Sequence, residues 1–332
     1  MTEPEQDAGG RGGRAWLRWV GWAVTAGFAV LGLLLLRDRW DEVQASGGLP
    51  GVVPFVAAIT INALANGVLV QAWREGIAVG GTRVPLGTAA RVWSASQLTR
   101  LGFAVAPIGA RPLMGRRYGI SPAVGAVTTL LEVAWLVALS PVLLLVTLPA
   151  WAGDAPAWRW AGVVGVVPAA VMVAVVAWPN RVIDLMRRSI EATPLRRLVG
   201  ATTLAAAGRI RVTRRTSTRW GALYVLNYGL RIAAYLVMLA AVDADLGVHA
   251  ARAVGAFALG QFVGNLAVVV PGGIGPREGA TALVLGPALG GGTALVVVAA
   301  TRLAELAAEL AFFGGSRLTP RRPGRPEGPG SR

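Results

Sequence analysis

An arginine and a glutamate stand side by side within an otherwise apolar stretch, residues 265–280, which reads NLAVVVPGGIGPREGA. The guanidinium of Arg277 has the fork geometry that suits a phosphate. If a helix begins near Pro276, its free N–H groups point into the preceding break and favour an anion, with Glu278 nearby. Glycine allows close backbone approach, and three glycines occupy the break: Gly272, Gly273 and Gly275. This pattern predicts a phosphate-binding site; an ordinary interfacial turn is the alternative.

A second stretch repeats the pattern 164 residues earlier in the chain. Gln97 precedes Pro107 by ten residues, as Gln261 precedes Pro271, and an Ile-Gly-x-Arg sequence follows each proline. The earlier copy ends at Arg111. We therefore predict a duplicated break in which Gln97, Gln261 and Arg111 join the same site, with chance similarity between two Gly- and Pro-rich turns as the alternative.

Further ionisable residues lie in apolar surroundings. Charges at membrane depth are costly, so they usually face the bundle interior in pairs. The spacing of Arg302, Glu305 and Glu309 places these three side chains on one helical face. Glu132 has no basic neighbour in sequence; we expect its partner to be Arg231, Arg277 or Arg302. These residues either line a polar path for a charged headgroup or form ion pairs that fix helix packing.

The composition identifies the class of protein. Of 332 residues, 54% are hydrophobic and 15% are charged, whereas soluble domains carry about 25% charged residues. An all-α, multi-pass membrane bundle is predicted. The first apolar segment lacks a cleavage site and is interpreted as a retained membrane helix. Eight apolar segments are recognised: 19–36, 51–73, 85–106, 120–148, 160–179, 220–242, 252–270 and 279–313.

The placement of arginine predicts the organisation and orientation of the chain. We expect a disordered N-terminus (1–14), a membrane domain (15–314) and a disordered basic tail (315–332). The membrane domain divides into halves, 15–180 and 220–314, joined by a linker, 181–219, that carries ten arginines. Basic loops stay in the cytoplasm, so the linker and both termini are predicted to face the cytoplasm of a bacterial cell, at its inner membrane.

Counting crossings between these loops requires an odd number in each half. The simplest solution is that one segment in each half, 85–111 and 252–277, enters the membrane without spanning it. The sequence GPALGGG within 279–313 predicts a short helix followed by a spanning one. The prediction is about six to eight transmembrane segments in two inverted repeats with broken or re-entrant helices, a recurrent transporter design.

Several function classes are excluded or disfavoured. The chain has no cysteine and one histidine, His249, so thiol chemistry and His-based metal clusters are excluded. No cofactor, metal or catalytic constellation is predicted, and the formal charge of +15 is attributed to membrane orientation instead of nucleic-acid binding. The acidic residues Asp243 and Asp245 could form the metal-binding pair of a glycosyltransferase, but no other catalytic carboxylates accompany them.

The stretch PGGIGPRE resembles the signature of the lysylphosphatidylglycerol synthase transmembrane-region family, also called the flippase-like domain family. The family's late PGGxGxRE motif is matched from Pro271 to Glu278, and its following arginine by Arg302. The family's earlier region is matched only by Pro107, Gly109 and Arg111, and Glu132 lacks the arginine that follows it in the family. The resemblance implies a multi-pass protein linked to lipid flipping, here without the soluble synthase domain.

The leading hypothesis is therefore a flippase-like protein that translocates or binds a phospholipid or another anionic lipid. Arg277 and Arg111 would contact the phosphate, while Glu278, Glu132 and Arg302 would balance the charge of the path. Membrane lipids are the expected partners. Two alternatives remain: a membrane-embedded transferase acting on lipid-linked sugars, and a non-transporting partner of cell-envelope enzymes.

Overall fold

The computed structural model describes residues 49–101, 106–150, 169–192, 211–242, 246–267 and 273–318, together with isolated positions. Every regular element in this part of the chain is helical, which confirms the all-α prediction. Three helices are long and apolar enough to cross a membrane: α3 (Val52–Val79), α6 (Pro122–Thr147) and α11 (Arg214–Ala240). The predicted first segment, 19–36, lies almost wholly outside the described residues.

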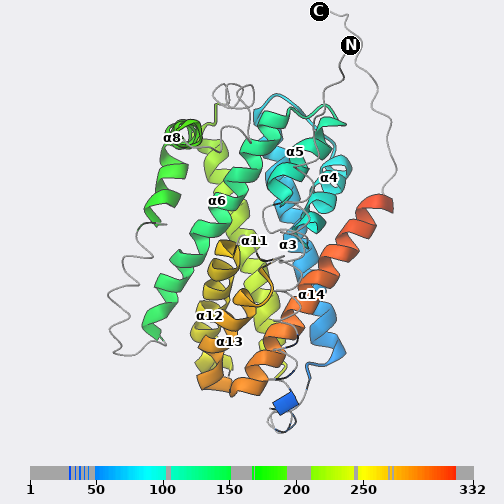
Figure 1. Cartoon of the computed structure of the whole chain (residues 1–332), viewed down its shortest axis with the longest axis vertical. Coiled ribbons are helices and arrows are strands. Elements are labelled where there is room, and N and C mark those ends of the chain that lie inside the picture. Colours follow the sequence, from blue (N-terminus) through cyan, green and yellow to red (C-terminus); the bar gives the residue numbers. More distant parts are fainter. Residues whose placement is uncertain are drawn as a thin grey trace, which may run out of the picture.

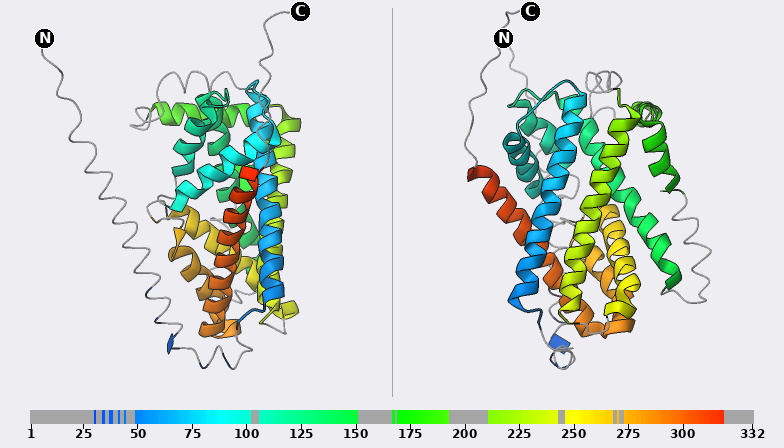
Figure 2. Two further views of the ribbon diagram at one scale, coloured as in Figure 1. Left: turned by 90° about the vertical axis from the view of Figure 1, so that its right-hand side faces the viewer. Right: turned by 180° about the vertical axis from the view of Figure 1, so that it is seen from behind.

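Helices α3 and α11 lie side by side at the centre and run in opposite directions (Figures 1 and 2). Each bears a buried asparagine, Asn62 on α3 and Asn227 on α11. The Asn227 amide donates to the backbone carbonyl of Ala65, at 2.8 Å. This hydrogen bond offsets part of the cost of burying the amide, while Asn227 Oδ1 is buried without a partner among the described residues.

A helical hairpin enters the bundle from each end (Figure 1). The first consists of α4 (Leu86–Leu98), a 3₁₀ turn η1 (Thr99–Leu101) and α5 (Ala106–Arg116). The second consists of α12 (Leu246–Leu266) and α13 (Pro276–Leu289). The second hairpin turns back between Leu266 and Pro276, where the break was predicted. The first predicted break was wrong: Pro107–Arg111 lie inside α5, and the chain turns back between Leu101 and Ala106. Pro107 is the second residue of α5, where a proline is tolerated because its missing N–H is not needed.

Each hairpin is followed by one long helix, α6 after the first and α14 (Gly291–Leu318) after the second. Helices α6 and α14 run in opposite directions along the bundle (Figure 1). The boundary between α13 and α14 is Gly290, whose φ of 80° only glycine adopts readily. The predicted division of segment 279–313 into a short helix and a long one is thereby confirmed.

The packing of the helices has approximate twofold symmetry. Exchanging α3 with α11, α4 with α12, α5 with α13 and α6 with α14 maps each packed pair onto another packed pair: α4 contacts α14 as α12 contacts α6, for example. Corresponding helices run in opposite directions in the figures. The two halves are therefore inverted repeats, as the odd number of crossings per half predicted.

The remaining helices and boundaries bear on the predicted domains. Helix α8 (Pro179–Glu191) lies across the end of the bundle where α11 begins (Figure 2). Helix α14 continues to Leu318, beyond position 315 where the tail was expected to start. Its last turn is held because Arg91 Nε donates to the Ser316 carbonyl at 3.1 Å. Residues 1–29 and 319–332, where most of both predicted disordered ends fall, lie outside the described part.

Candidate functional site

The first repeat buries one ion pair between its hairpin and α6. Arg111 and Glu132 are 1% and 3% exposed, and Arg111 Nη1 lies 2.7 Å from Glu132 Oε2. Arg111 Nε donates to Ser96 Oγ at 3.0 Å. The guanidinium lies between the rings of Trp73 and Trp93, 5.6 and 5.5 Å from their centroids. This guanidinium is thus enclosed by protein side chains and is closed to solvent.

The predicted partner of Glu132 was wrong. None of Arg231, Arg277 and Arg302 forms an ion pair with it; its partner is Arg111, from the hairpin of the same repeat. The two helices approach closely at Gly125, where an added Cβ would lie 3.1 Å from Pro112 Cα. The sequence could not show this pairing because it depends on how α5 folds back along α6.

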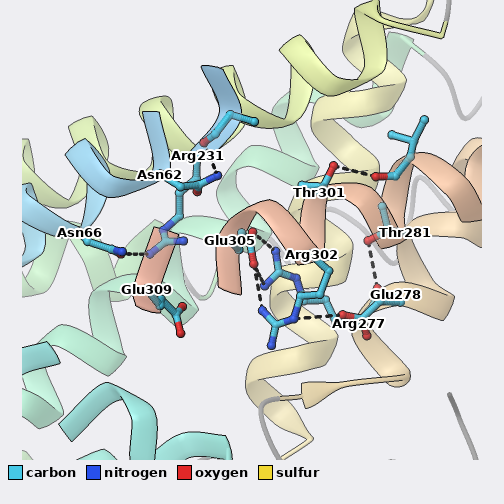
Figure 3. Close-up of polar contacts among 12 residues, drawn as sticks. Asn62, Asn66, Arg231, Arg277, Glu278, Thr281, Thr301, Arg302, Glu305 and Glu309 are labelled. Carbon is cyan, nitrogen blue, oxygen red and sulfur yellow. Dashed lines mark hydrogen bonds and ion pairs between the residues drawn. The ribbon is translucent and has the colours of Figure 1, made fainter. Parts of the chain in front are cut away.

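The second repeat buries a corresponding but larger cluster between α13 and α14. Both terminal nitrogens of Arg277 contact the two oxygens of Glu305, at 2.9 and 2.5 Å. Arg302 Nη1 lies 2.9 Å from Glu305, and Arg302 Nε lies 3.5 Å from Glu278 (Figure 3). The predicted alignment of charges along one face of α14 is confirmed, because Arg302, Glu305 and Glu309 are all buried.

Helix α13 begins at Pro276, as predicted. The two preceding described glycines, Gly273 and Gly275, have φ angles of 67° and 101°, which β-branched or bulky residues rarely adopt. The Gly275 N–H donates to Glu278 Oε2 at 2.6 Å, so the helix caps itself with its own carboxylate. The proposed anion role of this helix start stays a prediction; Gly272 lies outside the described residues.

Close helix packing holds the second hairpin together. Gly260 and Gly264 of α12 form a GxxxG pair facing α13. A Cβ on Gly260 would lie 2.0 Å from Thr281 Oγ1, and one on Gly264 would lie 3.0 Å from Arg277 Cβ. The sequence repeat places Ser96 opposite Gly260, so the first hairpin has a hydrogen-bonding serine where the second has a glycine.

The repeat also relates four polar residues on the two central helices. Asn62 and Asn66 on α3 are four residues apart, and so are Asn227 and Arg231 on α11. Arg231 Nη2 donates to Asn66 Oδ1 at 3.0 Å (Figure 3). The two residues that correspond between the repeats therefore contact each other where α3 and α11 cross.

A cavity of about 70 Å³ lies between the two hairpins, enough for several water molecules. Both repeat glutamines, Gln97 and Gln261, line it, together with Glu132, Arg231 and Arg277. Arg111 does not line it. The remaining lining residues come from both repeats: Leu69, Trp93, Arg100, Leu136, Tyr228, Asn265 and Glu309.

One ion pair crosses between the repeats at this cavity. Arg100, on the 3₁₀ turn of the first hairpin, pairs with Glu309 on α14. The second Glu309 oxygen is buried and has no hydrogen-bond partner within the described residues. Sequence reasoning did not identify Arg100, Asn66 or Asn265; the signal available for Asn66 was its spacing from Asn62, which repeats in α11.

Within the described residues, no group of three or more His, Cys, Asp or Glu side chains could hold a metal ion. Asp243 and Asp245, the pair considered for a sugar transferase, lie outside the described residues. No protein-family model matches the chain, and no curated protein or solved structure matches it.

Proposed function

We propose that this chain is a multi-pass inner-membrane protein that binds an anionic lipid by its headgroup in the central cavity and translocates it between leaflets. One observation carries the proposal: two re-entrant hairpins enter from opposite ends, and residues of both, Gln97 and Gln261, line one polar cavity. A headgroup bound there lies between the leaflets, and movements of either hairpin could open the cavity toward one side.

The buried charges support a polar path. Five arginines and four glutamates occupy the two clusters and the cavity, although a charge in the bilayer interior costs several kcal/mol by most measures. Many of these charges lie where the hairpins meet. Structural pairing accounts for Arg111 and Glu132, but it does not require Arg231 to face a cavity beside polar amides.

The distribution of surface arginines supports the orientation. The end of the bundle where α3 and α5 finish and α6 and α11 begin is strongly basic, and basic ends remain in the cytoplasm. Helix α8 lies across this end (Figure 2). The arginines in question are Arg74, Arg83, Arg116, Arg117, Arg181, Arg187, Arg188, Arg211, Arg214, Arg215 and Arg219.

The contacts in the structure change the roles that we assign to two predicted site residues, Arg111 and Arg277. Arg111 is enclosed by Trp73, Trp93 and Glu132, so we assign it a positioning role instead of phosphate contact. Arg277 faces the cavity while both its terminal nitrogens bind Glu305. The resemblance of residues 271–278 to the flippase-like family motif also supports lipid translocation.

The test is lipid translocation in proteoliposomes, measured by the accessibility of fluorescent phosphatidylglycerol to a quencher added outside. Since the chain has no cysteine, a single Gln261→Cys change introduces one thiol into the cavity. We expect the unlabelled variant to translocate lipid more slowly than the unmodified protein, because one amide of the cavity is lost. A bulky thiol reagent should abolish the remaining movement, because the reagent fills the cavity.

The matched control is Arg83→Cys, an exposed position outside the cavity, where the same reagent should leave translocation unchanged. Absence of lipid movement by the unmodified protein above that of protein-free liposomes would contradict the proposal and favour the non-transporting partner. Equal movement with and without reagent at position 261 would show that the cavity is not the path.

A further inference from the structure

The charges of the two clusters and the cavity do not balance. The arginines are Arg100, Arg111, Arg231, Arg277 and Arg302, and the glutamates are Glu132, Glu278, Glu305 and Glu309. Each of the four glutamates lies within ion-pair distance of an arginine. With five arginines against four glutamates, the group has one excess positive charge.

The excess charge can be assigned to Arg231. Its hydrogen-bond partner within the described residues is the neutral amide of Asn66, at 3.0 Å. Arg277 and Arg100, the other arginines of the cavity, are both bound to carboxylates. A guanidinium retains a strong preference for an anion when its protein partner is neutral.

The repeat symmetry shows why this charge is noteworthy. Arg231 corresponds to Asn66, at the same spacing from an asparagine one turn earlier. Two asparagines would satisfy the contact between α3 and α11 without introducing a charge. One repeat instead places a partly buried guanidinium at this contact, facing the cavity, although desolvating a charge that is bonded only to a neutral amide is costly.

The neutral polar groups of the cavity indicate which chemical groups the anionic ligand carries beside its charge. Gln261 and Asn265 line the cavity, and neither side chain has a hydrogen-bond partner within the described residues. The free oxygen of Glu309 is buried and needs a donor. Amides both donate and accept, so together these groups suit hydroxyls. A cationic headgroup would meet carboxylates whose charge is already neutralised by arginine.

We propose that the cavity binds a monoanionic phosphodiester with a neutral, hydroxylated headgroup, with Arg231 contacting the phosphate and Gln261, Asn265 and Glu309 contacting the hydroxyls. This inference rests on the proposed function for the identity of the ligand as a lipid. It also moves the principal phosphate contact from Arg277 to Arg231, because Arg277 is already bound to Glu305 on both terminal nitrogens.

The experiment measures thermal stabilisation of the purified full chain by short-chain lipids. Dihexanoyl phosphatidylglycerol has the proposed headgroup, dihexanoyl phosphatidylcholine adds a cation, and glycerophosphoglycerol has the headgroup without acyl chains. We expect phosphatidylglycerol to bind at least tenfold more tightly than phosphatidylcholine. Stabilisation by the lipid alone assigns the site to lipids, whereas stabilisation by both glycerol compounds assigns it to the phosphodiester; either result supports the site.

Two variants test Arg231 independently. Arg231→Gln should lower phosphatidylglycerol affinity about tenfold or more, because a charged hydrogen bond is lost, and Arg231→Lys should retain part of it. Asn66→Asp keeps the arginine and places a carboxylate on it; this nearly isosteric change should reduce the affinity similarly. Arg219→Gln, at an exposed arginine on the same helix, is the matched control and should bind as the unmodified protein does.

Unchanged phosphatidylglycerol affinity in both Arg231→Gln and Asn66→Asp would overturn the inference. So would equal affinity of the unmodified protein for phosphatidylglycerol and phosphatidylcholine. In either case, lipid translocation that is blocked at Gln261→Cys would leave the proposed function standing. Failure of the unmodified protein both to bind and to translocate any lipid would overturn the two together.

Discussion

Each repeat pairs an arginine of its hairpin with a glutamate on the long helix that follows. The two repeats differ in how they bury this pair. Arg111 is 1% exposed and lies between two tryptophan rings. Arg277 has 14% of its side chain exposed, contacts Phe257 on one side and faces the cavity. The comparison indicates that the pair Arg111–Glu132 stabilises the fold, whereas Arg277 of the second copy belongs to the lining of the cavity.

The second copy is also reinforced. Arg302 contacts Glu305 in addition to Arg277, so removing Arg277 leaves Glu305 with a partner. The first copy has no second arginine at Glu132 among the described ion pairs, and its other contacts come from neutral groups, Trp93 and Gln97. The two arginines should therefore differ in how their removal divides between stability and function.

The largest expected effect is that of Arg111→Ala. It leaves the buried carboxylate of Glu132 without a cation, which costs about 3–5 kcal/mol of unfolding free energy. Thermal unfolding followed by tryptophan fluorescence in detergent measures this. The double variant Arg111→Met with Glu132→Leu should recover much of the stability, because no buried charge remains. If the single variant Arg111→Ala is as stable as the unmodified protein, the stabilising role of the Arg111–Glu132 pair is contradicted.

Arg277→Ala should destabilise the protein less, by about 1–3 kcal/mol, since Arg302 continues to pair with Glu305. Its effect on lipid translocation should exceed what the loss of stability explains, because Arg277 lines the cavity. The measurement is the rate of lipid translocation per folded molecule, with a purified Arg277→Lys variant for comparison. Equal translocation by Arg277→Ala and the unmodified protein would remove Arg277 from the path.

The hairpin contacts provide a third comparison. Gly260→Ala places a methyl group 2.0 Å from Thr281 Oγ1 and 3.0 Å from the Arg277 carbonyl, and overpacking of this kind costs about 1–3 kcal/mol. Thermal unfolding of this variant should show a clear loss. Gly279→Ala is the control, because a Cβ there has no atom within 4 Å, and its midpoint should not fall.

At the corresponding position of the first hairpin, Ser96→Gly should cost about 1 kcal/mol, because it removes the hydrogen bond from Arg111 Nε without adding bulk. Both single changes are measured by the same thermal unfolding. An unchanged midpoint for Ser96→Gly would show that this hydrogen bond does not stabilise the first hairpin.

The smallest expected effect on stability is that of Arg100→Gln. Arg100 is 23% exposed and pairs with the buried Glu309 across the repeats. Glutamine retains an N–H group that can donate to the Glu309 carboxylate, so only about 1 kcal/mol should be lost. Removing this arginine makes the cavity less positive, so translocation of an anionic lipid should slow relative to a zwitterionic one. An unchanged ratio of the two rates would show that the pair does not influence selectivity.

The sequence predicted the helical class, the inverted repeats, the second break and the division of the last segment near Gly290. These predictions held because apolar length and Pro/Gly breaks act locally along the chain. The first break was misplaced, because Pro107 is accommodated in the first turn of α5. The pairing of Glu132 with Arg111 and the cavity role of Asn66, Arg100 and Asn265 could not be predicted. They depend on which faces of distant helices meet, and neutral amides give no strong signal in an apolar sequence.

The surroundings of Arg111 could not be predicted from the sequence either. Its place in the repeat suggested that it would share the role of Arg277, and the sequence contained no sign that Trp73 and Trp93 would enclose it. Symmetry of sequence predicted symmetry of position correctly. It did not predict the difference in environment, which arises from a tryptophan pair in one repeat and a phenylalanine in the other.

The proposed translocation path requires both hairpins to be re-entrant. Single cysteines at Arg83 and Arg116, before and after the first hairpin, and at Ala241 and Leu289, before and after the second, can be labelled in intact cells with an impermeant thiol reagent. We predict that Ala241→Cys and Leu289→Cys label from outside, while Arg83→Cys and Arg116→Cys label only after permeabilisation. Labelling of the two ends of either hairpin from opposite sides would contradict the account.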